Sequence, residues 1–287
     1  MTTQLLKSPA SLKNSTIAFI GGGNMASSLI GGLISAGCDA NNIRVSEPND
    51  VQLDILCKHY HITPCDTNDD AVNGADVVVF AVKPQVLNTV CKQLCPSLQQ
   101  HKPLILSIAA GVCETNIQQW VGGNLAIVRT MPNTPALIQT GASGLYANQF
   151  VNDLQHSLAE SIMRAVGITH WVSDEQQMNA ITAISGSGPA YFFYFMESMQ
   201  KSAIALGLDA ECARLFTLQT ALGAAKMALE SSESCHDLRK KVTSPGGTTE
   251  QAIQSFDTNK LADTVDQAVN AAYQKSIQLG ELLGKNI

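Results

Sequence analysis

Charged side chains are scarce in this chain of 287 residues: Asp, Glu, Lys and Arg make up 15% of it, and aromatic residues only 5%. So little charge excludes a disordered chain, and the 45% of hydrophobic residues supply an ample core. Because the surface of a lone monomer usually carries more charge, we expect part of this surface to be buried in an oligomer.

The sequence also lacks an excess of positive charge. Its 18 Lys and Arg stand against 24 Asp and Glu, so no broad phosphate-neutralising surface is expected and nucleic acid is excluded as a partner. No apolar run is long and uncharged enough to cross a bilayer, and residues 1–14 contain no apolar core of signal-peptide length. We therefore expect a flexible N-terminal extension over 1–14, no membrane partner and a cytoplasmic protein.

Metal-binding and acid–base patterns are missing as well. The eight cysteines include no Cys-x-x-Cys pair and no Cys/His cluster with zinc-like spacing, so we expect buried free thiols, a reducing compartment and no metal. No His/Asp pair or paired carboxylates stand out, and the six histidines have no evident mutual spacing. A reaction that needs elaborate proton-transfer machinery is therefore not indicated.

What the first half of the chain does have is a repeated alternation of β-branched runs and helix-like segments. The runs lie at 16–20, 43–46, 76–82, 104–109 and 125–130, and the helical segments at 24–36, 50–60, 84–98 and 114–121. Runs with so little polar alternation are typical of strands buried on both faces. With further strands at 144–147 and 168–172 around a helix over 152–166, the pattern predicts an α/β fold: a Rossmann-type, doubly wound, mostly parallel sheet over 15–172.

After Val172 the pattern changes to helices alone. Helical spacing of Ala, Leu, Gln and Met runs through 174–183, 189–206, 209–230 and 257–283, which predicts an all-helical domain over 173–287. Pro189 suits the first turn of its helix, with Ser187 as a candidate cap. The small residues of 218–229 permit close helix packing, either in a tight bundle or between interdigitated subunits.

A glycine-rich turn follows the first predicted strand. Residues 20–26 read G-x-G-x-x-A, where the glycines permit a tight turn and the helix start offers unpaired N–H groups to a pyrophosphate. In isolation such a string is often only a strand–helix turn, but the surrounding repeat favours dinucleotide binding. Glu47, at the end of the second strand, favours NADH, while Arg44 or Ser46 could still receive the 2′-phosphate of NADPH, so both cofactors remain open.

A second turn, at 242–249, has the sequence VTSPGGTT and precedes a helical stretch that begins near Glu250. Its Pro-Gly-Gly turn offers backbone N–H groups, flanked by three hydroxyl side chains, and such a site suits a carboxylate. An ordinary capped loop is the alternative interpretation.

At this point the sequence resembles the pyrroline-5-carboxylate reductase family over nearly all of 16–279. Seven motifs occur in matching order: IGGGNM at 20–25, AVKP at 81–84, SIAAG at 107–111, RTMPNTP at 129–135, SGSGPAY at 185–191, GAAKM at 223–227 and VTSPGGTT at 242–249. The resemblance implies that NADPH or NADH delivers a hydride to the imine carbon of 1-pyrroline-5-carboxylate, the carbon that becomes C5 of L-proline, in the last step of proline biosynthesis.

The resemblance also implies roles for single residues. The expected cofactor-binding residues are Ile20, Gly21, Gly22, Gly23, Asn24, Met25, Glu47, Asn68, Ala81, Val82, Lys83, Pro84, Ile108, Ala109 and Ala110. The expected substrate-binding residues are Lys241, Ser244, Gly247, Thr248 and Thr249, and the hydroxyl of Thr249 is expected to orient the ring nitrogen as the catalytic group. Lys83 is expected to contact the cofactor rather than transfer a proton, and Lys226 to lie on a helix surface or at an interface.

The resemblance leaves several points open. Relatives more often carry serine than Glu47 at the ribose position, and some have Asn where Lys241 stands. The helical domain is expected to form a homodimer, and the resemblance allows a decamer of five dimers. Two alternatives are another imine or β-hydroxyacid reductase of the same layout, which would not need the SPGGTT string, and a nucleotide-binding protein without turnover.

Overall fold

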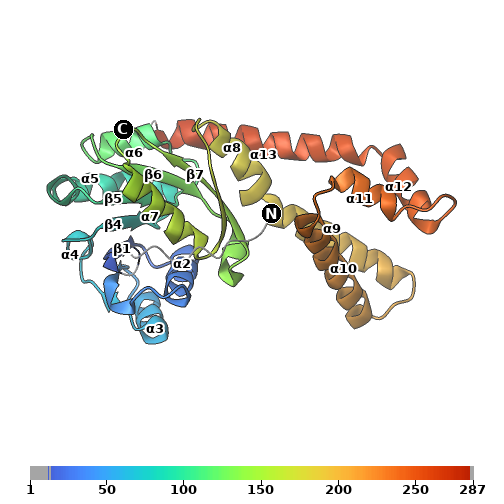
Figure 1. Cartoon of the computed structure of the whole chain (residues 1–287), viewed down its shortest axis with the longest axis horizontal. Helices are drawn as coiled ribbons and strands as arrows, with labels where there is room; N and C mark the ends of the chain where they lie inside the picture. The colour runs from blue at the N-terminus through green and yellow to red at the C-terminus, as the bar shows by residue number, and fades with distance from the viewer. Residues whose placement is uncertain (1–11, 13, 285–287) are drawn as a thin grey trace. The chain divides into compact units, whose positions relative to one another are not determined.

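The computed structural model describes residue 12 and residues 14–284, which divide into two compact units. The first unit holds the described residues up to Ser187 and those from Ala272 onward, and the second holds Gly188–Ala271. The chain therefore passes between the units twice (Figure 1). The sequence places the start of the helical domain at residue 173, whereas the second compact unit begins at Gly188.

The first unit is built on eight strands. They are β1 Ile17–Ile20, β2 Ile43–Ser46, β3 Thr63–Pro64, β4 Val77–Phe80, β5 Leu104–Ser107, β6 Ile127–Met131, β7 Gly141–Ala147 and β8 Gly167–Trp171. They form one sheet in the order β3-β2-β1-β4-β5-β6-β7-β8, in which every neighbouring pair is parallel except the antiparallel pair of β6 and β7. The predicted doubly wound, mostly parallel sheet is confirmed.

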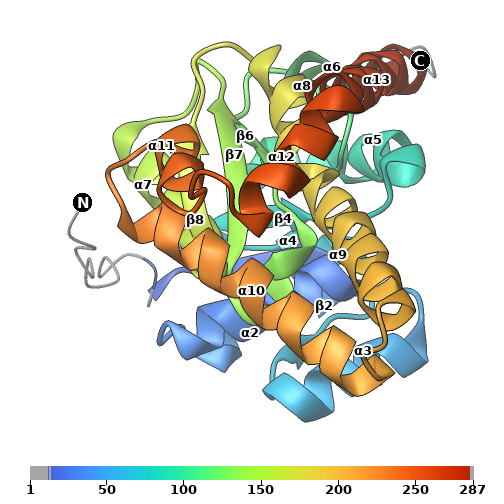
Figure 2. The same ribbon diagram turned by 90° about the vertical axis from the view of Figure 1, so that its right-hand side faces the viewer.

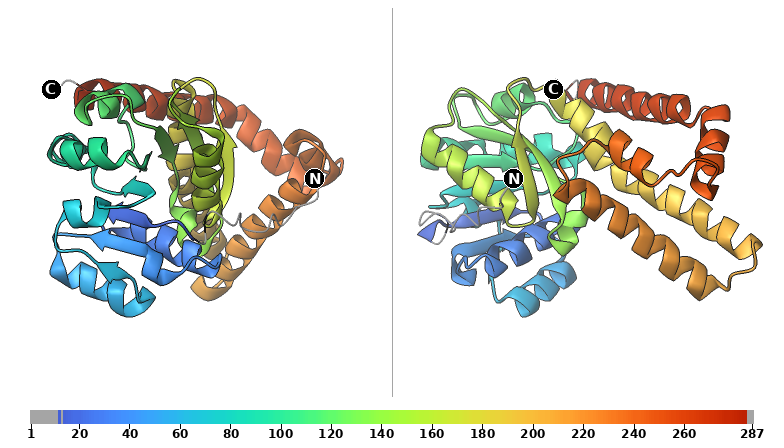
Figure 3. Two further views of the ribbon diagram at one scale, coloured as in Figure 1. Left: turned by 60° about the vertical axis from the view of Figure 1, so that its left-hand side comes forward. Right: turned by 45° about the vertical axis from the view of Figure 1, so that its right-hand side comes forward.

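Helices cover both faces of this sheet (Figure 3). The helices of the first unit are α2 Asn24–Ser35, α3 Asp50–Tyr60, α4 Asn68–Val72, α5 Pro84–His101, α6 Glu114–Trp120, α7 Asp153–Arg164 and α8 Gln177–Ile181, with short 3₁₀ turns η1 Ala40–Asn42 and η2 Thr134–Ile138. Alternate residues of β1 belong to two different hydrophobic cores. Phe19 belongs to the core that includes residues of α2, α3 and α7, and Ile20 to the core that includes residues of α4, α5 and α6.

The second unit is helical, as predicted. It contains α9 Gly188–Ala205, α10 Ala210–Glu230, α11 Cys235–Lys241, α12 Thr248–Thr258 and the first part of α13 Leu261–Gly284. The long helices α9 and α10 pack against each other and are joined by a short turn at Gly207 (Figure 2). Large apolar side chains of both helices, including Phe192, Tyr194 and Phe216, are well exposed in the single chain.

Four details differ from the sequence-based expectation. The helix expected over 257–283 is interrupted, because Lys260 adopts a left-handed conformation between α12 and α13. Ser187 does not have the extended backbone of a helix cap, since it ends a π-helix, η3 Thr182–Gly186, with helical dihedral angles. Of the N-terminal extension, only Leu12 and Asn14 lie within the described residues, and Leu12 is buried in the core. The eight cysteines are free, as expected, but only Cys38 and Cys91 are buried; five are half-buried and Cys235 is exposed.

A buried polar cluster joins α6 to the sheet. The Glu114 side chain accepts a hydrogen bond from Asn148 Nδ2 at 2.7 Å, and the same amide nitrogen donates to the Leu125 carbonyl at 2.9 Å. Burial raises the pKa of Glu114, the Asn148 hydrogen bond opposes that shift, and the charge of Glu175 raises the pKa further. The folded protein therefore holds a proton on Glu114 more tightly than the unfolded chain does.

This shift predicts a pH-dependent effect of the substitution Glu114→Gln. A raised pKa means that the wild-type protein loses stability as the pH rises through that pKa, because the buried carboxylate must then carry its charge. Relative to wild type, Glu114→Gln is expected to gain about 1–3 °C in Tm between pH 5 and pH 8, measured by thermal unfolding.

The matched control is Glu160→Gln in α7. Burial raises the pKa of Glu160, but hydrogen bonds from Arg164, Trp171 and Thr169 and the charge of Arg164 outweigh it and lower the pKa. Because this carboxyl is ionised in both the folded and the unfolded state above pH 5, the Tm difference between Glu160→Gln and wild type should stay nearly constant between pH 5 and pH 8. Equal Tm differences at both pH values for Glu114→Gln would contradict the assigned cause.

Candidate functional site

The first candidate site lies at the carboxyl ends of β1 and β4. The two strands are in register from Ile17 opposite Val77 to Ile20 opposite Phe80, and the Ala81 N–H donates to the Ile20 carbonyl at 2.9 Å. From here the chain leads into α2, which packs on one face of the sheet, and into α5, which packs on the other. Such a switch point is where ligands bind in doubly wound sheets.

The glycine turn has the geometry that its sequence predicts. Gly21 has a φ of +100°, and a Cβ atom there would lie 2.8 Å from the Ala81 carbonyl oxygen, so a side chain is excluded. Gly23 is exposed, and a Cβ atom on it would meet no heavy atom within 4 Å. Gly23 also precedes the first turn of α2, which receives no side-chain cap from the residues described. The first N–H groups of α2 are thus available to an anion.

Glu47 is held directly beside this turn. Its carboxylate accepts the Gly22 N–H at 2.7 Å and the Asn49 N–H at 3.0 Å. The Gln52 side chain donates to the Gly22 carbonyl at 2.9 Å, a support that the sequence analysis missed. The only sequence signal for it is the position of Gln52 in the first turn of α3, which Asn49 caps.

The two other candidates for phosphate recognition make different contacts. The Arg44 guanidinium donates to the Asn73 carbonyl at 2.6 Å, and Asn73 precedes β4 at the opposite edge of the sheet. Ser46 is buried, and its carbonyl oxygen accepts the Gly21 N–H at 2.9 Å. Of these three residues, Glu47 is the one whose side chain bonds to the glycine turn.

Three further segments follow the carboxyl ends of neighbouring strands. Residues 81–84 follow β4, with Lys83 exposed at the start of α5, and residues 108–110 follow β5. Asn68 begins α4, which follows β3. Because the strands are parallel, these segments lie along the same edge of the sheet as the glycine turn.

The second candidate site lies within the second unit, at the start of α12. Gly247 precedes this helix without a side-chain cap from the residues described, which leaves the N–H groups of Thr248 and Thr249 available. The Gly247 N–H donates to the Ser244 carbonyl at 3.0 Å, and the Gly246 N–H donates to Glu250 at 2.8 Å. The turn is thus stabilised by a backbone hydrogen bond within it and by the Glu250 carboxylate.

The expected lysines have other partners. Lys241 bonds both carboxylate oxygens of Glu233, at 2.6 and 2.8 Å. Lys226 lies exposed on α10, 3.7 Å from Glu230, as expected of a helix-surface lysine. Among residue 12 and residues 14–284, no three His, Cys, Asp or Glu side chains form a group that could hold a metal ion.

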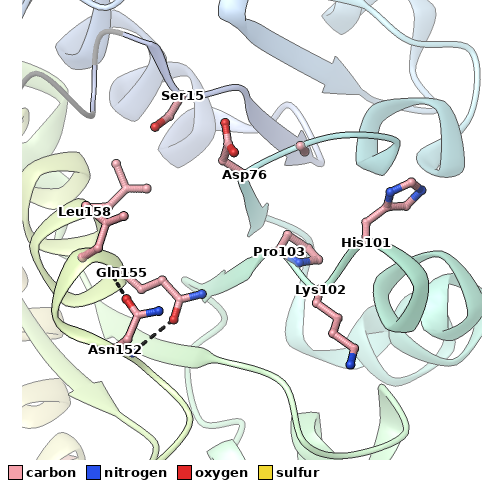
Figure 4. Close-up of a pocket in the computed structure, with 10 residues that line it drawn as sticks. Ser15, Asp76, His101, Lys102, Pro103, Asn152, Gln155 and Leu158 are labelled. Carbon is pink, nitrogen blue, oxygen red and sulfur yellow. Dashed lines mark hydrogen bonds between the residues drawn. The ribbon is translucent and has the colours of Figure 1, made fainter.

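A hollow of about 280 Å³ lies at the opposite edge of the sheet (Figure 4). Ser15, Asp76 and Pro103, which precede β1, β4 and β5, line it. Its polar groups serve local structure: Asn152 and Gln155 cap α7 through mutual hydrogen bonds, and Asp76 accepts the Thr16 N–H at 2.8 Å. No residue of either candidate site lines this hollow, so it is not the cofactor site.

Family models match both halves of the chain. Residues 175–279 match a model described as pyrroline-5-carboxylate reductase dimerisation, and residues 16–111 match one described as NADP oxidoreductase, coenzyme F420-dependent. In the part of the chain that the structure describes, no helix has both the length and the apolar character needed to span a membrane.

Relatives match almost the whole chain. A pyrroline-5-carboxylate reductase of Pseudomonas aeruginosa is 51% identical over 94% of this chain and 98% of its own length, and one of Pasteurella multocida is 42% identical over 93% and 98%. Among solved structures, a pyrroline-5-carboxylate reductase of Coxiella burnetii is 47% identical with a TM-score of 0.88, covering 92% of this chain and 98% of its own. The Plasmodium falciparum enzyme with NADP bound is 31% identical with a TM-score of 0.84, covering 93% and 99%.

The two glycines of the turn predict separable effects. Gly21→Ala is expected to destabilise the first unit by about 2–4 kcal/mol, because it adds left-handed strain and a contact with the Ala81 carbonyl. Gly23→Ala should leave Tm unchanged but weaken the binding of a reduced nicotinamide dinucleotide, because its methyl group occupies the space that a pyrophosphate would approach. Thermal unfolding and fluorescence titration measure the two effects, and wild-type affinity in Gly23→Ala would contradict the assignment.

Proposed function

The chain belongs to the pyrroline-5-carboxylate reductase family, and from this membership we propose how its residues perform the reaction. It is an NAD(P)H-dependent oxidoreductase that reduces the C=N bond of 1-pyrroline-5-carboxylate to give L-proline. The observation that carries this function is the combination of near-complete similarity to these reductases with the dinucleotide turn and the SPGGTT turn in one chain.

The residues around Gly23 fit a dinucleotide. The space beside Gly23, where a Cβ atom would lie, contains no other heavy atom within 4 Å. The start of α2 has no side-chain cap from the described residues, so its N–H groups suit a pyrophosphate. We assign this role to Ile20, Gly21, Gly22, Gly23, Asn24 and Met25, and place the adenosine ribose beside Glu47. Since that carboxylate would repel a 2′-phosphate, it supports a preference for NADH. Asn68 and the segments 81–84 and 108–110 would line the rest of the dinucleotide-binding site.

The start of α12 is assigned to the substrate carboxylate. The Ser244 hydroxyl and the N–H groups of Gly247 and Thr248 would bind it, while the positive end of α12 offsets its charge. The Gly247 N–H must then share its bond to the Ser244 carbonyl with the substrate. Lys241 is assigned an indirect part, because Glu233 already binds its ammonium group.

The reaction requires little acid–base catalysis from the protein. When bound, the reduced nicotinamide would supply a hydride to the imine carbon, which is C2 of the pyrroline ring and becomes C5 of proline, while the C=N electron pair moves to the nitrogen. The protonated imine is already electrophilic, so the chain's task is to hold and orient the substrate and to exclude water. Thr249 would orient the ring nitrogen through its hydroxyl, because an alcohol is a poor proton donor at neutral pH.

Residues 173–287 are assigned to substrate binding and dimerisation. The match to the dimerisation model shows a homo-oligomer, and the exposed Phe192, Tyr194 and Phe216 supply apolar surface for it. We extend this to a homodimer that can assemble into a decamer of five dimers. Eight free cysteines are consistent with the reducing cytoplasm. Light scattering at several concentrations tests the size, and a stable monomer would contradict it.

The function itself is tested by following the oxidation of NADH and NADPH on addition of 1-pyrroline-5-carboxylate. We expect turnover with both cofactors and a lower KM for NADH, because of Glu47. Oxidation of 3-hydroxyisobutyrate with NAD⁺ is the assay for a β-hydroxyacid enzyme. Absence of imine turnover with either cofactor would overturn the proposed function, and a much lower KM for NADPH would overturn only the role of Glu47.

The role of Thr249 is tested by Thr249→Val, which keeps the shape of the side chain but removes the hydroxyl. Loss of one neutral hydrogen bond is expected to cost about 0.5–1.5 kcal/mol, or up to about tenfold in kcat/KM for the imine. Thr249→Ser, which keeps the hydroxyl, is the matched control. Wild-type kcat/KM in Thr249→Val would show that the hydroxyl does not contact the substrate.

A further inference from the structure

Residues 111–116 directly follow the segment 108–110, to which we assigned cofactor binding. The end of α13 packs on them: a Cβ atom on Gly280 would lie 3.1 Å from the Gly111 carbonyl oxygen, and one on Gly284 would lie 2.6 Å from Asn116. The small residues of α13 thus allow its backbone to lie against this stretch. Any shift of residues 111–116 would be transmitted to 108–110.

Glu175 holds the same stretch from another direction. Cys113 precedes α6 without making a side-chain cap, and the Glu175 carboxylate oxygen Oε1 accepts the Glu114 N–H at 2.6 Å instead. A carboxylate 61 residues away therefore caps α6, where the positive end of the helix favours its charge.

The same oxygen of Glu175 accepts a hydrogen bond from Arg129 Nη1 at 2.8 Å. Arg129 lies in β6 beside Ser107, the last residue of β5, and its side chain is only 4% exposed. The pair thus connects the strand beside the start of the segment 108–110 with the helix that follows its end. A carboxylate at this position restrains both flanks of the segment at once.

A hydrogen bond between Asn179 and Ser276 links α8 to α13, the helix that packs on residues 111–116. The Ser276 hydroxyl, which is buried, donates to Asn179 Oδ1 at 2.8 Å. Asn179 lies in α8, four residues beyond Glu175, and Ser276 lies in α13. Glu175, α8 and α13 therefore form one connected support around residues 111–116.

We propose that Glu175 is a positioning residue for hydride transfer: by capping α6 and pairing with Arg129, it holds the segment 108–110 in the geometry that the nicotinamide needs. This inference rests on the proposed function, through the role assigned to residues 108–110. Glu175 does not touch the reacting atoms. Its effect is on the alignment of the reactants, and small misalignments slow a reaction that depends on orientation.

The test compares Glu175→Gln with Glu175→Ala, using the full-length enzyme. Gln keeps an acceptor for the Glu114 N–H but leaves Arg129 without its charge partner, and Ala removes both interactions. We expect kcat to fall about 5- to 10-fold in Glu175→Gln and further in Glu175→Ala. The primary isotope effect with dinucleotide deuterated at the transferred position should rise, because hydride transfer becomes more rate-limiting.

Glu160→Gln is the matched control, because Glu160 also binds an arginine, Arg164, at 2.8 Å, while its hydrogen bonds within the described residues are to α7 and β8 and not to residues 111–116. It should keep the wild-type kcat and isotope effect. If Glu175→Ala does not fold, the double variant Arg129→Met, Glu175→Met removes the buried charges together, which proteins often tolerate well. That variant should fold and still show the raised isotope effect.

A merely structural role predicts a different result. Loss of folded enzyme lowers the number of active sites, but leaves the isotope effect and both KM values at their wild-type levels. Wild-type isotope effects and kcat per active site in Glu175→Gln and in the double variant would overturn the proposal. Absence of turnover in the wild-type enzyme would instead overturn the proposed function.

Discussion

The alignment of parallel strands at their carboxyl ends is the constraint on which the rest of this structure depends. Since β1 and β4 end in register, Gly21 must turn beside the Ala81 carbonyl, and only a glycine fits there. The helices that follow then start at the same edge of the sheet with unpaired N–H groups. The site that we assign to the cofactor is thus shaped by backbone geometry, with few charged side chains.

Under the proposed assignment, a chain with 15% charged residues would bind its anionic ligands mainly through backbone N–H groups. Both candidate sites rely on helix starts, at Gly23 for α2 and at Gly247 for α12, and in neither does a side chain among the described residues cap the helix. The charged groups beside them are acidic: Glu47 bonds to Gly22, and Glu250 bonds to Gly246. Each carboxylate accepts a backbone N–H group of its turn and so stabilises the conformation of the turn.

Most regular elements could be predicted from sequence, because their patterns repeat over several turns or strands. The helix α3 begins and ends at the predicted residues, and each of the five apolar runs coincides with a strand, although β6 extends one residue beyond its run. Short elements, which span too few repeats of a hydrophobic pattern, were missed: β3 has two residues, α4 has five and α11 has seven. The π-helix η3 and the break at Lys260 depend on backbone details that composition does not encode.

The sequence by itself determined the chemistry of the turns, because Gly21, Gly23 and the SPGGTT string act through local backbone conformation. It also determined the fold class, since hydrophobic periodicity is a local property. Only the tertiary structure decided which side chains support those turns: Glu175 caps a helix 61 residues away, and Ser276 bonds Asn179 across 97 residues. Such contacts leave no periodic signal in the chain, because they depend on how distant elements pack.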